Sequence, residues 1–216
     1  IKIGLPAGLQ SMVFSLSNVV IQAAINSFGS DGIAGSTAEQ NFEFMAYFVI
    51  NAFAQTATTF TSQNFAAQDK ERCKKIYRLC TFIGLASCFG LSLIFLIGRH
   101  LFIQIFSTDE NVIHYAMIRM WSVCLLELLT GVYEISGGCL RGMGHSMTPA
   151  VITVLGTCVF RLVWVNTIYV AHRSYIMLMI VYPVSWVITG TAVTVAYFIT
   201  RRKEFAQIGK RRADII

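Results

Sequence analysis

Charged residues are scarce in this chain of 216 residues, because Asp, Glu, Lys and Arg together make up only 13% of it. Soluble globular domains carry about 25% charged residues. So few charges cannot cover the surface of a water-soluble fold, and the composition therefore excludes an ordinary soluble domain. Apolar residues take their place and reach 55%, with a mean hydropathy of +0.62. This balance indicates a surface that faces lipid.

Residue sets that support metal and enzyme chemistry are also missing from the sequence. The six cysteines include no Cys-x-x-Cys pair, and the four histidines are scattered along the chain. The spacing therefore predicts no metal site, and the cysteines fit the role of small buried hydrophobes. No convergent set of nucleophile, base and metal ligands is recognisable, which argues against a membrane enzyme.

What the chain does contain is six long apolar stretches. They run over about residues 5–28, 33–61, 76–98, 113–136, 147–170 and 175–199. Each has at least the ~20 residues that a helix needs to cross a hydrocarbon core. The sequence therefore predicts an all-α, polytopic membrane protein with six transmembrane helices and a basic tail over residues 201–216. Pro183, inside the last stretch, predicts a kink.

The basic residues are divided unevenly between the two sides that six spans would define. Only Arg99 and Arg173 lie on the outer side, and Arg119 and Arg161 fall inside apolar stretches. The remaining thirteen share one side: Lys2, Lys70, Arg72, Lys74, Lys75, Arg78, Arg141, Arg201, Arg202, Lys203, Lys210, Arg211 and Arg212. This asymmetry predicts a plasma-membrane protein with both termini in the cytoplasm. The net charge of +6 then indicates membrane lipid rather than nucleic acid as a partner.

Polar residues recur at helical spacing inside the first two stretches. The first stripe consists of Ser11, Ser15, Asn18, Gln22 and Asn26, and the second of Glu43, Tyr47, Asn51 and Gln55, with Glu39 extending it outward. Amide side chains in lipid cost free energy unless they find partners. Two interpretations stay open. The stripes either form hydrogen bonds between helices at tight crossings, or line a water-filled translocation cavity. Their length favours the cavity.

Ionisable residues inside membrane spans are functional candidates by default. Glu127, near the middle of the fourth stretch, is the first candidate for ion coupling or substrate binding. Glu43 in the second stretch and Glu134 in the fourth are further candidates. Arg161 lies in the middle of the fifth stretch, where we expect a structural ion pair with Glu127. Arg119, near the outer end of the fourth stretch, is expected to reach toward the membrane surface.

A buried carboxylate suits transport because desolvation disfavours its charged form. A proton, a sodium ion or a cationic substrate each relieves that cost. Competition among them for one carboxylate is the physical basis of antiport.

Two loops on the basic side carry recognisable motifs. Ser62-Gln63-Asn64-Phe65-Ala66-Ala67, followed by DKERCKK at 69–75, resembles the G-Q-N-x-G-A…R pattern of the multidrug and toxic compound extrusion (MATE) transporters. Leu140-Arg141-Gly142-Met143-Gly144-His145-Ser146, ending in Pro149, resembles their L-R-G-x-G-x-S-x-x-P loop. Gly4-Leu5-Pro6 resembles the opening of the family's second half. Ser62 and Ala66 replace two glycines of the pattern, which could stiffen that loop.

The resemblance covers about residues 1–200 and implies a protein with twelve spans in two lobes, of which this chain is the second and the N-terminal six-helix lobe is missing. It implies an exporter of drugs or organic cations that is driven by Na⁺ or H⁺ and needs no other cofactor. Two alternatives stay open. One is a flippase for lipid-linked precursors from the same wider superfamily. The other is a membrane scaffold subunit without transport, which would be expected to have apolar span interiors.

Overall fold

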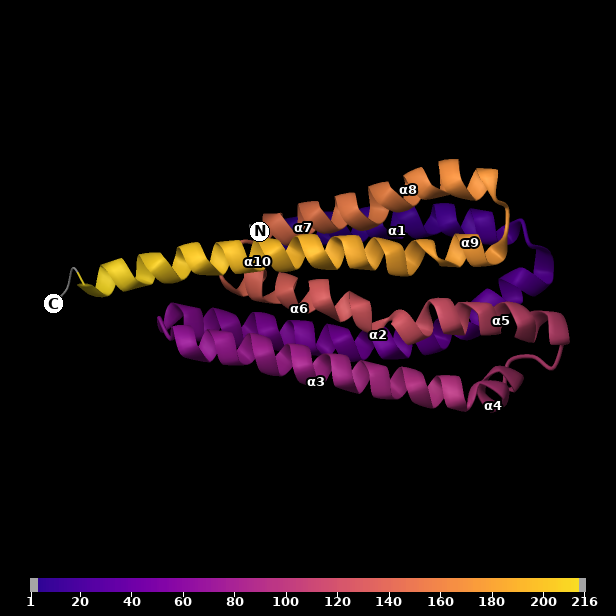
Figure 1. The fold of residues 1–216 in the computed structure, drawn as a ribbon, viewed down its shortest axis with the longest axis horizontal. Helices are drawn as coiled ribbons and strands as arrows, with labels where there is room; N and C mark the ends of the chain where they lie inside the picture. Colours follow the sequence, from indigo (N-terminus) through magenta and orange to yellow (C-terminus); the bar gives the residue numbers. More distant parts are fainter. Residues whose placement is uncertain (1–3, 214–216) are drawn as a thin grey trace.

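The computed structural model describes residues 4–213, with the side chains of residues 10–208. The predicted basic tail over 201–216 is thus described in part, and the side chains of Lys2, Lys210, Arg211 and Arg212 lie outside the described set. Within the described residues the chain is all-α and contains no strand, as the sequence predicts. The helices lie side by side along the longest axis (Figure 1).

The first half of the chain forms four helices: α1 (Gly4–Asn26), α2 (Gly29–Ala66), α3 (Lys70–Ile97) and the short α4 (Arg99–Gln104). The turn between α1 and α2 is tight, because α2 begins at Gly29, whose φ of +77° favours glycine. The motif segment expected as a loop at 62–75 is mostly helical instead. Asp69 accepts a hydrogen bond from the Arg72 backbone N–H at 3.0 Å and thereby caps α3. Only the short turn between Ala66 and Lys70 separates α2 from α3.

The second half of the chain contains several interrupted helices. In chain order they are α5 (Glu110–Ser122), the 3₁₀ turn η1 (Cys124–Leu126), α6 (Leu128–Gly142), α7 (Met147–Thr153), the π-helical η2 (Val154–Val159), α8 (Phe160–Trp164), the π-helical η3 (Val165–Tyr169), α9 (Tyr175–Met179) and α10 (Val181–Ala213). The kink expected at Pro183 is present. The helix breaks between α9 and α10 at Ile180, since Pro183 has no N–H to offer the carbonyl of Met179.

Four helical stretches of the described chain are long and apolar enough to cross a membrane. They are Lys70–Ile97, Glu110–Gly142, Met147–Tyr169 and Tyr175–Ile208. Helix α1 has 23 residues and α2 has 38, so both have the necessary length. The polar stripe of α2 lowers its hydropathy, whereas the first part of α1 lies outside the described side chains. That they also span the membrane stays a prediction.

The bundle has two sides. Figure 1 shows α2 and α3 along one edge and α1 with α7 and α8 along the other, with α6 and α10 between them. Glycines let α6 approach α2 closely: a Cβ on Gly138 would lie 2.5 Å from the carbonyl oxygen of Ala54, and one on Gly142 would lie 2.7 Å from that of Thr58. The spacing of four places both glycines on one helix face, a common arrangement where membrane helices cross.

Candidate functional site

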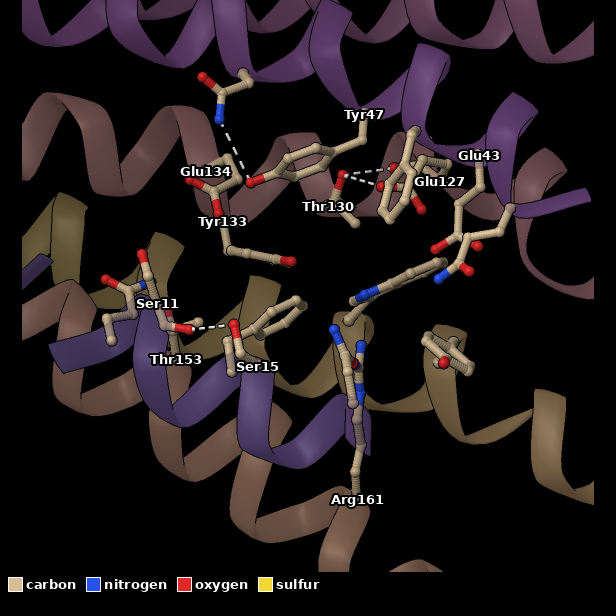
Figure 2. Close-up of a pocket in the computed structure, with 18 of the residues that line it drawn as sticks. Ser11, Ser15, Glu43, Tyr47, Glu127, Thr130, Tyr133, Glu134, Thr153 and Arg161 are labelled. Atoms are coloured by element: carbon tan, nitrogen blue, oxygen red, sulfur yellow. Dashed lines mark hydrogen bonds between the residues drawn. The ribbon is translucent and has the colours of Figure 1, made fainter. Parts of the chain in front are cut away.

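A cavity of about 780 Å³ lies between the α1 side and the α2–α6 side of the bundle. Figure 2 shows its polar side chains converging from both sides. Most residues of the two predicted stripes line the wall, among them Asn18, Gln22, Tyr47, Asn51 and Gln55, whereas Asn26 and Glu39 do not. Segments far apart in the chain therefore meet around one polar space.

Some stripe residues bond along their own helices, whereas Asn18 accepts a bond from Arg161 and Glu43 accepts one from Arg119 on another helix. Gln22 Nε2 donates to Asn26 Oδ1 at 3.1 Å, and Asn51 Nδ2 lies 3.4 Å from the Tyr47 hydroxyl oxygen. A stripe that joined helices would instead need bonds from one helix to the next. The bonds of Gln22 and Asn51 therefore favour a water-facing wall at these positions.

Glu127 lies at an interruption of its helix. The chain leaves α5 at Val123, tightens into the 3₁₀ turn η1 and resumes as α6 at Leu128, so that Glu127 sits at the junction. Its side chain lines the cavity but is only 2% exposed. Its Oε1 accepts a bond from the Thr130 hydroxyl at 3.2 Å. Within the described part of the chain, its Oε2 has no hydrogen-bond partner and no ion pair reaches it.

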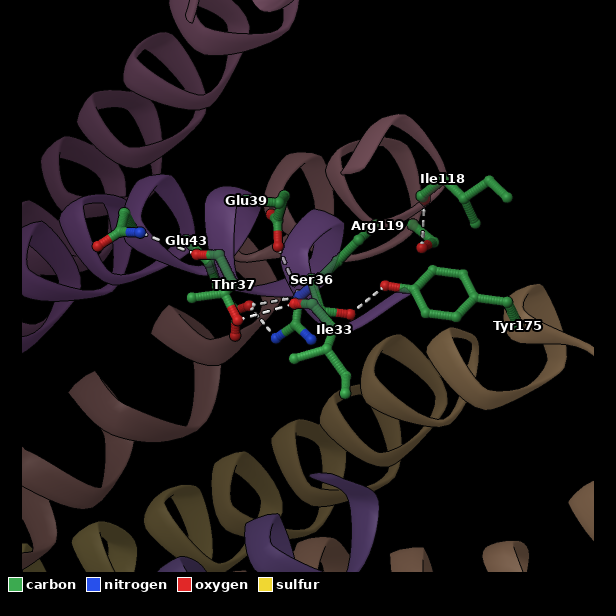
Figure 3. Close-up of polar contacts among 10 residues, drawn as sticks. Ile33, Ser36, Thr37, Glu39, Glu43, Ile118, Arg119 and Tyr175 are labelled. Carbon is green, nitrogen blue, oxygen red and sulfur yellow. Dashed lines mark hydrogen bonds and ion pairs between the residues drawn. The ribbon is translucent and has the colours of Figure 1, made fainter. Parts of the chain in front are cut away.

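Glu43 is neutralised by a buried arginine. Arg119 Nη2 donates to Glu43 Oε2 at 2.6 Å and Arg119 Nε donates to the same oxygen at 3.3 Å. A second carboxylate, Glu39, places its Oε2 2.6 Å from Arg119 Nε, an ion pair without hydrogen-bond geometry because that N–H is directed at Glu43. Figure 3 shows Arg119 beside Glu39 and Glu43 of α2. The expectation that Arg119 reaches the membrane surface is therefore wrong: the side chain is buried, because two carboxylates one turn apart provide its counter-charge.

Glu134 is also paired. Its Oε2 lies 3.6 Å from Arg141 Nη2, and both side chains line the end of the cavity where α6 terminates. Of the three acids that the sequence predicts as ion-coupling candidates, Glu127 is therefore the one whose charge has no cationic partner among the described residues.

The remaining motif residues do not line the cavity but shape the helix ends. Gly144 adopts a φ of +91° in the turn that leads from α6 to α7, and Pro149 lies in the first turn of α7, where a missing N–H costs nothing. Gln63 and Asn64 lie in the last turn of α2, and Asn64 Nδ2 donates to the carbonyl of Phe60 at 2.8 Å. These positions, with Gly142 at the α2 crossing, support the fold around the cavity.

Arg161 does not form the expected ion pair with Glu127. Its Nε donates to Ser185 Oγ at 3.1 Å and its Nη1 donates to Asn18 Oδ1 at 3.4 Å. The reason is the arrangement of the helices: α8 packs on the α1 and α10 side, whereas Glu127 belongs to the opposite wall, as Figure 2 shows.

Sequence reasoning missed the role of Arg119 and the two aromatic residues Tyr182 and Trp186, which line the cavity from α10. A signal for Arg119 was present. Glu39 and Glu43 stand four residues apart on one helix face, and an arginine within an apolar stretch needs a carboxylate. No comparable signal marks Tyr182 or Trp186, because aromatic residues in a membrane helix face lipid as often as protein.

Comparisons with known proteins agree on one family. The sequence model of the family described as MatE matches residues 6–166. The probable multidrug resistance protein YoeA of Bacillus subtilis is 22% identical over 158 residues, covering 71% of this chain and 33% of YoeA. The multidrug export protein MepA of Staphylococcus aureus is 23% identical over 155 residues, covering 71% of this chain and 34% of MepA.

The fold matches that of solved transporters. The crystal structure of the Vibrio cholerae MATE transporter VcmN in the bent form superposes with a TM-score of 0.84 at 19% identity, covering 94% of this chain and 46% of that chain. The chain thus spans about a third of the length of the curated relatives that it matches and about half of VcmN.

The buried cluster of Arg119, Glu39 and Glu43 yields a stability prediction. Arg119→Met leaves two buried carboxylates without a counter-charge, and we expect it to lower the free energy of unfolding by about 3–5 kcal/mol. The triple variant Glu39→Gln/Glu43→Gln/Arg119→Met removes all three charges and should recover most of that loss. Thermal unfolding of the purified chain in detergent measures both, with Arg173→Met, at an exposed loop residue, as the control. An Arg119→Met variant as stable as the Arg173→Met control would contradict the assignment.

Proposed function

The chain belongs to the MatE family of membrane transporters, and we propose that it forms the second six-helix lobe of a secondary active exporter. In this proposal the inward movement of Na⁺ or H⁺ drives drugs or organic cations out of the cell. The relatives YoeA and MepA, a probable multidrug resistance protein and a multidrug export protein, support the export of small molecules rather than of lipid-linked precursors.

The observation that carries the proposal is the carboxyl group of Glu127. It lies in a polar cavity, is almost completely buried, and has an oxygen without a partner in the described structure. A buried carboxylate without a counter-charge is unstable in its charged form. Binding a proton, a sodium ion or a cationic substrate stabilises it, so only one of them occupies the site at a time. That exclusivity is the property that an antiporter needs.

The other acids of the cavity fit supporting roles. Arg119 holds Glu43, and Arg141 holds Glu134, so neither acid needs an ion from solution to balance its charge. The lining itself argues against a scaffold subunit without transport, since an assembly subunit needs no polar interior.

We propose the predicted orientation with both termini in the cytoplasm. It places Ser30, in the first turn of α2, outside, and Arg202, in the C-terminal part of α10, inside. Single cysteines at these positions in intact cells should react with a membrane-impermeant thiol reagent at Ser30 and not at Arg202. The reverse pattern of labelling would invert the topology.

The role of Glu127 is tested by Glu127→Gln in the complete transporter. Glutamine keeps the shape of the side chain but neither exchanges a proton nor balances a cation, so export of a fluorescent organic cation driven by a pH or Na⁺ gradient should fall to the level of empty vesicles. Because no ion pair to Glu127 is broken, the melting temperature should not decrease. Glu110→Gln, at an exposed residue at the start of α5, is the matched control. Export by Glu127→Gln at the rate of the Glu110→Gln control would remove Glu127 from the mechanism.

A second test concerns the missing lobe. In two-lobed transporters, access alternates because one repeat moves against the other around a central site. Reconstituted alone in liposomes, this chain should therefore show no export driven by an ion gradient, and co-expression with a matching first lobe should restore it. Robust export by a monomer of this chain would refute the half-transporter proposal.

A further inference from the structure

Arg161 lies in the least regular part of the bundle. It belongs to the five-residue helix α8, which is enclosed by the π-helical segments η2 and η3. Segments of π-helix inside α-helices are often found at functional sites, because they re-aim side chains at the expense of regular hydrogen bonding. Here the guanidinium of Arg161 reaches the cavity wall, and Figure 2 shows it extending toward the side that carries Glu43 and Glu127.

The partners of this guanidinium are all uncharged. Its Nε and Nη1 donate to the hydroxyl of Ser185 and the amide oxygen of Asn18. Its Nη2 has no hydrogen-bond partner among the described residues, although Arg161 is only 1% exposed. No carboxylate of the described chain forms an ion pair with it.

Aromatic rings hold the guanidinium in place. Its Cζ lies 4.5 Å from the ring centroid of Tyr182 and 5.4 Å from that of Phe14. Cation–π contacts of this kind stabilise a cation by about 0.5–2 kcal/mol, less than a buried charge costs. The two contacts therefore orient Arg161 without neutralising it.

The other arginines on the cavity wall differ in this respect. Arg119 contacts Glu39 and Glu43, and Arg141 contacts Glu134. The described cavity therefore contains one carboxylate and one guanidinium, Glu127 and Arg161, that each present an unpartnered atom from opposite walls.

We infer that Arg161 is the residue of the substrate site that binds the anionic group, a carboxylate or a comparable group, of a substrate that also carries a cation. This inference rests on the proposed function, since it takes the cavity as the transport cavity. The anionic group binds the Nη2 of Arg161 in a charge-assisted hydrogen bond. The cationic part faces Glu127, and an aromatic ring system packs between them against Tyr182 and Phe14.

The test is a binding measurement with two dyes that differ in one group. Rhodamine B carries a fixed delocalised cation and a free carboxylate, whereas rhodamine B ethyl ester carries the same cation and no anion. Fluorescence anisotropy with the purified full chain in neutral detergent gives both dissociation constants. We expect the chain to bind the free acid about tenfold more tightly than the ester, the size of one charge-assisted hydrogen bond.

Variants locate the preference within the cavity. Arg161→Gln should abolish the preference for the free acid, so that the two dyes bind this variant with equal affinity. Arg161→Lys keeps the charge but loses the fork of donors, so it should keep part of the preference. Arg173→Gln removes an arginine from an exposed loop and serves as the matched control with the full preference.

Four outcomes would overturn the inference: equal affinity of the unchanged chain for both dyes, no binding of either dye, binding of the ester alone, or a preference that survives in Arg161→Gln. The first does not depend on how well any variant folds. Tight binding of the ester alone would refute the anion site but leave the export of cations intact. Conversely, a normal preference for the free acid in a protein that never exports would refute the proposed function and leave the anion site in place.

Discussion

A polar side chain within a membrane is stable only when another group of the protein or water satisfies it, and this constraint determines the arrangement of the chain. Two helices carry stripes of amides and hydroxyls, and they are stable in the bundle because their polar faces turn toward a common cavity. The apolar faces of α3, α5, α7 and α10 are then left for lipid, and hydropathy accordingly recognises membrane-crossing stretches in α3 and the later helices but not in α2, whose polar stripe lowers its hydropathy.

The same constraint divides the charges of the cavity into two classes. Arg119 lies between Glu39 and Glu43 at distances that leave no room for an exchangeable ion, so this cluster fastens α5 to α2. A buried charge network of this kind is costly to break and is therefore better suited to structure than to transport. Arg119 is paired with Glu39 and Glu43, and Arg141 is paired with Glu134. Glu127 and Arg161 are then the charged residues of the wall with an atom that has no partner in the described structure.

Both of these residues lie where the helix is irregular. Glu127 follows a 3₁₀ turn that separates α5 from α6, and Arg161 lies between two π-helical segments. Non-helical or distorted backbone inside a membrane is tolerated where it lines a polar cavity, because water and side chains there can satisfy the freed carbonyl and amide groups. The irregularities and the available charges thus have one cause, a polar space within the bundle.

The sequence by itself determined the fold class, the family and the polar faces. Long apolar stretches follow directly from the thickness of a membrane, and residues such as Asn18, Gln22, Asn51 and Gln55 could be assigned to the cavity because helical periodicity specifies which side chains share a face. The kink before Pro183 followed from a missing N–H. Periodicity does not specify, however, which face of another helix lies opposite. The pairing of Arg119 with Glu43, 76 residues apart, and the separation of Arg161 from Glu127 were decided only by the tertiary structure, because the energy of a charge depends on its nearest neighbours in space.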